Sequence, residues 1–153
     1  MFMILLGIFW FGQAFTIYGA ITRAAQEGAR AGAVPYCATC PGINTHGQYA
    51  TNSANAVMSA LTASKLDWNQ AQYPVPEPTV TSCIPAPVTC STGGDPHFCV
   101  QLPIQMNVKP GGAGACGVSV SFRYPFRFWL PFTSINNQQI WMTASARVRL
   151  EGR

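Results

Sequence analysis

The sequence predicts an α+β fold in which a long N-terminal helix and a second helix pack on a small antiparallel sheet. Three observations predict it. Residues Met1 to Thr22 carry no charged side chain and are mostly apolar. Residues 46–64 repeat apolar side chains every three or four positions, which is typical of an amphipathic helix. Residues 118–124 and 140–150 alternate apolar and polar side chains, which is typical of half-buried antiparallel strands.

The first helix is long enough to cross a membrane. A spanning helix needs about 20 apolar residues, and the uncharged run from Met1 to Thr22 just suffices. Residues 23–33 are rich in alanine, glutamine, glutamate and arginine, so the helix is expected to continue until Pro35 stops it. We therefore divide the chain into a transmembrane or stem helix, residues 1–34, and an extracytoplasmic domain, residues 35–153.

Small and charged side chains of this helix form a candidate helix interface, because small faces let helices approach closely. The candidates are Gly12, Ala20, Arg23, Ala24, Glu27, Gly28, Arg30 and Gly32. Two interpretations stay open for the small residues: they contact partner helices, or they pack on the chain's own domain. The charged side chains Arg23, Glu27 and Arg30 lie four and three positions apart, so they form a ladder on one face of the helix. Two roles stay open for this ladder: it sets the register with a partner helix, or it is solvated at the membrane surface.

The remaining chain predicts a third strand over 98–107 and turns rich in glycine, proline and asparagine. Five prolines lie in 73–87, which indicates extended connecting chain with a short edge strand at 79–83. An aromatic stretch bracketed by prolines, residues 125–132, lies between the two alternating strands.

Six cysteines favour disulfides and an oxidising compartment outside the cytoplasm. They are Cys37, Cys40, Cys83, Cys90, Cys99 and Cys116. Pairing each cysteine with its nearest neighbour in sequence predicts bonds 37–40, 83–90 and 99–116, although fifteen pairings are open. The basic residues after the helix would place the domain in the cytoplasm by the positive-inside rule. We give the cysteines precedence, because an upstream start would add residues before Met1 and change the charge balance on that side of the helix.

Other functional classes have weaker support. Cys37 and Cys40 form a CxxC that would suit a periplasmic thiol-disulfide protein or a metal site, but no βαβ pattern surrounds it and no second CxxC follows. The two histidines, His46 and His97, add only an unspecific ligand set. No hydrolase, phosphate-binding or nucleic-acid motif is present, so we expect no enzyme activity, cofactor, small-molecule substrate or nucleic-acid partner.

Three segments together resemble the TadE-like family of pilus-assembly proteins: the uncharged N-terminal helix leading into AITRAAQEGARAGAV, the stretch VSVSFRYPFRFWLPF, and the final strand ending TASARVRLE. The resemblance implies a pilin-like fold and a structural, pseudopilin-like subunit of a tight-adherence (Flp-type) pilus or related secretion machine. It implies a single-pass protein of the bacterial inner membrane whose domain faces the periplasm and whose helix meets other pilus subunits, the assembly platform and lipid. Entry into the pilus is left open. The prepilin-peptidase site common in the family cannot be read before the apolar stretch, so we expect an upstream start or an unprocessed member.

Overall fold

The computed structural model describes residues 2–34, 46–83, 88–90, 96–107, 115–127 and 139–150. Its elements are α1 (Phe2–Ala33), α2 (His46–Ala63), a 3-10 helix η1 (Trp68–Gln70), β1 (Cys99–Asn107), β2 (Ala115–Arg127) and β3 (Gln139–Arg149). The predicted α+β fold, with its long first helix, second helix and small antiparallel sheet, is confirmed.

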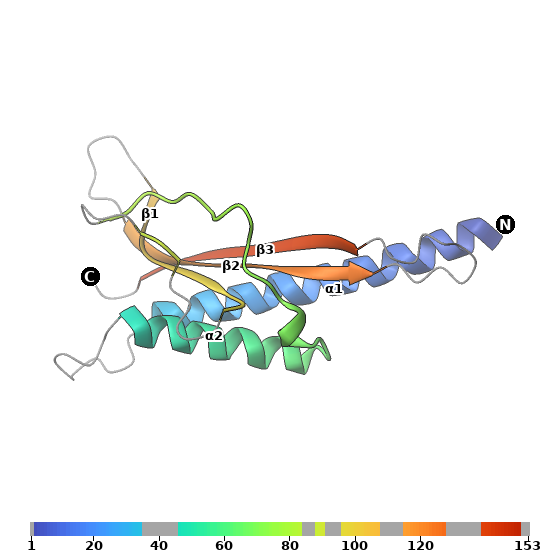
Figure 1. Ribbon diagram of the computed structural model, residues 1–153, viewed down its shortest axis with the longest axis horizontal. Coiled ribbons are helices and arrows are strands. Elements are labelled where there is room, and N and C mark those ends of the chain that lie inside the picture. The colour runs from blue at the N-terminus through green and yellow to red at the C-terminus, as the bar shows by residue number, and fades with distance from the viewer. Residues whose placement is uncertain are drawn as a thin grey trace.

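The domain has two layers, with both helices on one face of a sheet in the order β1-β2-β3 (Figure 1). Both strand pairs are antiparallel. Helix α1 packs against α2, β2 and β3, while its N-terminal part projects beyond the sheet (Figure 1). The core between the layers consists of small residues from α1 and larger apolar residues from the other elements. Fully buried examples are Ala24, Ala25, Ala29, Val57, Leu61, Val118, Val120 and Phe122.

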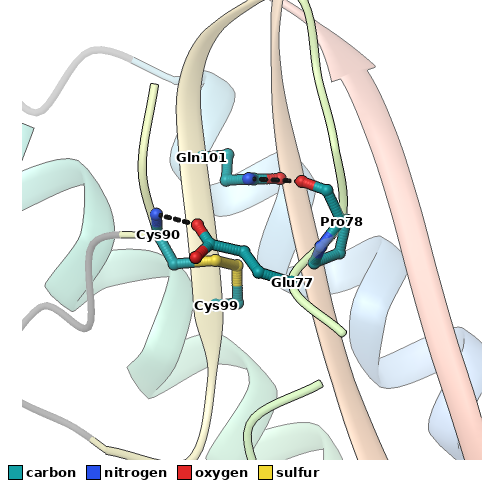
Figure 2. The surroundings of a disulfide bond; sticks show 5 residues. All are labelled: Glu77, Pro78, Cys90, Cys99 and Gln101. Atoms are coloured by element: carbon teal, nitrogen blue, oxygen red, sulfur yellow. Dashed lines mark hydrogen bonds between the residues drawn. A yellow bond between two sulfur atoms is a disulfide. The ribbon is translucent and has the colours of Figure 1, made fainter. Parts of the chain in front are cut away.

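Strand β2 is covered on both faces, which its alternating sequence does not indicate. Val118, Val120 and Phe122 form the inner face, but Ser119 and Ser121 on the outer face are buried as well. Segment 71–83 and the chain around Cys90 lie against this outer side of the sheet (Figure 2). The polar residues of this strand therefore face a covering segment and not solvent.

Segment 71–83 is tied to the sheet at both ends by backbone hydrogen bonds. At its start, Gln72 exchanges two bonds of 2.8 Å with Arg123 of β2. At its end, the N–H of Gln105 donates to the Thr81 carbonyl at 2.7 Å. The Cys83 N–H donates to the Pro103 carbonyl at 3.1 Å. The predicted edge pairing at 79–83 therefore exists, as a short bridge beside β1.

Pro125 lies inside β2, where proline would normally break a ladder. Arg123 directs its N–H and carbonyl toward Gln72, and in an antiparallel strand the residue two positions on points the same way. Among the described residues no strand pairs with β2 on that side beyond Arg123. The missing N–H therefore costs no strand pairing, and β2 continues to Arg127 against β3.

The disulfides correct the nearest-neighbour pairing. Cys83 is bonded to Cys116, with Cα atoms 5.9 Å apart, and Cys90 is bonded to Cys99, with Cα atoms 4.9 Å apart. The predicted pairs 83–90 and 99–116 are wrong because β1 and β2 run antiparallel. In the antiparallel arrangement Cys99 lies opposite Ser121, away from Cys116. The end of segment 71–83, which lies beside β1, is next to the start of β2, where Cys116 lies. Cys37 and Cys40 lie outside the described residues.

Non-reducing peptide mapping should recover one cross-linked pair that contains Cys83 and Cys116 and another that contains Cys90 and Cys99. The expected result follows from strand order, because the backbone bonds of Thr81 and Cys83 place this segment beside β1, next to the start of β2. A peptide that links Cys83 to Cys90 would contradict the strand arrangement itself.

Candidate functional site

Helix α1 has two halves with opposite exposure. In the first half six large apolar side chains face outward, with exposed fractions from 57% at Phe9 to 68% at Ile4, and the other described ones are partly exposed. From Ile21 onward, one face of the helix is fully buried in the domain. A single continuous helix therefore has an exposed apolar surface in its first half and a face buried in the domain core in its second half.

The described part of the chain contains one segment, Ile4–Ala33, that is long and apolar enough to cross a membrane. Only 6% of its most apolar window is buried, whereas the core helix of a soluble protein would be mostly buried. Exposed residues such as Ile4, Phe11 and Phe15 would be unfavourable in water at this density. The first half of α1 therefore has the properties of a membrane anchor.

Three of the predicted interface residues face the chain's own domain. Ala24 is fully buried, and Gly28 and Gly32 are buried as well. A Cβ atom at Gly28 would overlap the Val57 side chain of α2 and lie 3.1 Å from the Ser53 carbonyl. Of the two interpretations left open by the sequence, the structure supports packing on the chain's own domain for these three residues. They are small because α1 approaches α2 and the sheet closely.

Gly32 shows the same close approach one helical turn later. A Cβ atom there would overlap the Ser53 hydroxyl and lie 3.2 Å from the Val118 side chain of β2. A signal for this was present in the sequence, since Ile21, Gly28 and Gly32 recur at helical spacing opposite the charged residues. A stripe of small residues facing away from a charged stripe is typical of a helix packed on its own core.

The other predicted interface residues remain on the surface. Gly12 is exposed, and a Cβ atom at this position would meet none of the other described parts of the chain within 4 Å. Ala20 is partly exposed. Arg23, Glu27 and Arg30 are exposed, and the Arg30 guanidinium lies 3.8 Å from the Glu27 carboxylate. These positions form the candidate assembly surface.

A groove of 470 Å³ adjoins the charged part of this surface, between α1 and α2. Glu27, Arg30 and Ala31 line it from α1, and small side chains line it from α2. The α2 residues are Ala56, Ser59 and Ala60. The groove extends the candidate assembly surface from α1 onto the second helix.

The cluster of Glu77, Cys90 and Cys99 does not form a metal site. Glu77, Cys90 and Cys99 place their ligand atoms within 4.8 Å of one another, but both sulfurs are used in the disulfide (Figure 2). The Glu77 carboxylate accepts a hydrogen bond of 2.8 Å from the Cys90 N–H. With both sulfurs in the disulfide, the Glu77 carboxylate is the single donor left in this cluster, whereas a zinc site needs three or four protein ligands. This cluster therefore fastens the covering segment to β1.

His97, the other candidate ligand, has a structural environment. Its Nδ1 lies 2.6 Å from the Ala71 carbonyl oxygen. Its ring lies between Trp68 and Phe98, with centroid separations of 5.7 and 6.2 Å. The ring is therefore fixed by packing at the junction of η1 and the sheet. The CxxC and the side chain of His46 lie outside the described residues, so the alternative based on Cys37 and Cys40 stays a prediction.

The comparisons with known proteins agree with the N-terminal part of this picture. The family model described as TadE-like protein matches residues 1–30. This stretch covers the exposed half of α1 and most of its buried half. No curated protein and no solved structure matches the chain.

Proposed function

We propose, from the TadE-like match of residues 1–30, that this chain is a membrane-anchored structural subunit for assembly of a tight-adherence (Flp-type) pilus or a related secretion machine. The division of α1 is the observation that carries the proposal. One half of the helix is uncovered and apolar, and the other half is built into the domain. Such a helix positions a folded domain at a membrane and needs no catalytic group to do so.

In this proposal α1 inserts in the bacterial inner membrane and the sheet domain faces the periplasm. Two disulfides support a periplasmic location of the domain, since such bonds persist in oxidising compartments. The exposed surface around Gly12, Arg23 and Glu27 would meet the helices of other pilus subunits or of the assembly platform. The protein would act by position and contact, as a pseudopilin does, and not as an enzyme.

The charged part of the surface offers a direct test. Glu27 pairs with Arg30 three residues away on the same exposed helix face, and such pairs contribute only about 0.3–0.5 kcal/mol to stability. A Glu27→Lys substitution should therefore leave the domain folded. If Glu27 meets a partner, the same change should reduce pilus assembly and co-purification with the assembly platform.

The measurement is pilus yield and co-purification, each normalised to the membrane abundance of the variant. Gln26→Lys is a matched control, because residue 26 is an exposed neighbour on the same helix and also gains a positive charge. Normal assembly with Glu27→Lys, at normal abundance, would rule out a partner contact at this position. Normal assembly in a strain that lacks the whole protein would contradict the proposed function.

A further inference from the structure

The end of the β2–β3 hairpin at which the chain passes from β2 to β3, where Arg127 pairs with Gln139, lies beside the apolar half of α1. The arrowhead of β2 and the start of β3 are next to α1 on the side from which its N-terminal half projects (Figure 1). Met142 of β3 lines a shallow apolar groove together with Phe11, Ala14, Phe15 and Tyr18 of α1. These helix residues all belong to the uncharged run that ends at Thr22.

This arrangement limits how α1 can enter a bilayer. Met142 pairs with Tyr124, and the strands continue past it, toward the end of the hairpin, to the pair Arg127 and Gln139. If residues Phe11 to Tyr18 lie within the bilayer, then Met142 and the strand pairs between it and Arg127–Gln139 must also contact the bilayer. With α1 inserted to this depth, the membrane contact of the protein includes this end of the sheet as well as α1.

The side chains at this strand end suit a membrane interface. Ile140 is 49% exposed and Trp141 is 36% exposed, on opposite faces of β3. The chain has no charged residue between Arg127 and Arg147, so no charge in this stretch opposes contact with lipid. Tryptophan is enriched at the boundary between headgroups and acyl chains.

Two arginines supply the positive charge that a lipid headgroup layer attracts. The Arg123 guanidinium lies 4.4 Å from the centroid of the Trp141 ring and donates a 3.0 Å hydrogen bond to the Gln72 side chain. Arg127 is exposed on the last described rung of the hairpin. A long arginine side chain can lie along apolar surface while its charged end reaches phosphate.

We propose that the β2–β3 strand end, with Ile140, Trp141 and Arg127, is a second membrane-contacting element that rests in the headgroup region of a phospholipid bilayer beside α1. The proposal rests on the membrane anchoring of α1 in the proposed function, and it does not depend on pilus assembly. It adds a lipid surface as the partner of the sheet.

Tryptophan fluorescence tests the contact in the full chain. The four tryptophans are Trp10, Trp68, Trp129 and Trp141, and variants that keep one of them with phenylalanine at the others report on single positions. The proteins are reconstituted in vesicles of phosphatidylcholine and phosphatidylglycerol, with acyl chains brominated next to the headgroup or left unbrominated. Bromine quenches only nearby rings, so loss of Trp141 emission in brominated vesicles is the expected result.

A matched control uses the same strand. Ser145 is exposed and lies on the Trp141 face of β3, four residues farther from the strand end. A variant with Ser145→Trp and no other tryptophan should keep its emission in brominated vesicles and be quenched by acrylamide from water. Equal, weak lipid quenching of Trp141 and of this control, with Trp10 strongly quenched in vesicles brominated near the acyl-chain ends, would overturn the proposal.

Two further outcomes separate the possible failures. If the variant that keeps only Trp10 is quenched neither by lipid brominated next to the headgroup nor by lipid brominated near the acyl-chain ends, α1 is not inserted, and the membrane anchor of the proposed function fails as well. If Trp141 is shielded from acrylamide without lipid quenching, and loses this shielding when excess lipid dilutes the protein, its neighbour is a second copy of the chain. That result also overturns the lipid contact.

Discussion

A Gly28→Leu substitution is expected to destabilise the domain severely. Even the first carbon of the new side chain would overlap Val57 of α2 and crowd the Ser53 carbonyl, which is backbone and cannot rotate away. Overpacking of this kind typically costs about 1–3 kcal/mol, and leucine adds three more carbons to the same contact. Because small domains have roughly 5–15 kcal/mol of stability in total, a clear fall in abundance should follow.

The measurement is urea unfolding of the detergent-solubilised protein by circular dichroism, together with abundance in membranes. Gly12→Leu is the matched control, since Gly12 lies in the same helix and, among the residues that the structure describes, no packed neighbour lies within 4 Å of its Cβ position. It should leave unfolding unchanged and reveal only an effect on assembly. Equal stability of the two variants would show that α1 does not approach α2 as closely as Gly28 indicates.

Removal of the disulfide between Cys83 and Cys116 is expected to have the second large effect. The two cysteines are 33 residues apart, and closing a loop of this length reduces the entropy of the unfolded chain. The chain-entropy relation gives about 4 kcal/mol for this loop. The bond also fastens the end of segment 71–83 to the first rungs of β2, so its loss should loosen the edge beside β1.

The bond between Cys90 and Cys99 is the internal comparison, because it closes a separation of only 9 residues. The same relation gives about 3 kcal/mol. We expect the double serine variant at 83 and 116 to unfold at lower urea concentration than the one at 90 and 99. The reverse order would show that loop length does not control the loss, and that contacts around the shorter bond dominate.

The helices and strands follow from local patterns in the sequence, but the covering of the sheet does not. Residues 118–124 alternate strictly, and this alternation identified the strand and its inner face. It also suggested that Ser119 and Ser121 face water. They are buried because the proline-rich segment 71–83 pairs with both β1 and β2, a contact between distant residues that no local pattern encodes.

The candidate site was predictable in outline because the apolar helix, like the strands, is identified by a local pattern. An uncharged run identifies an apolar helix by composition alone, and its exposure agrees with that interpretation. Which partner the small residues face depends on packing, and composition left own-domain and partner contacts equally open. Disulfide pairing also depends on strand order in space, so proximity in sequence was a poor guide for Cys83 and Cys99.

The continuity of α1 has a mechanical consequence. No break or described hinge separates the lipid-compatible half of this helix from the half that fills the core. A pull or tilt applied to the anchor is therefore transmitted to α2 and the sheet as a load on packed side chains. The domain cannot swivel on a tether above the bilayer, and its orientation changes only if the whole molecule leans.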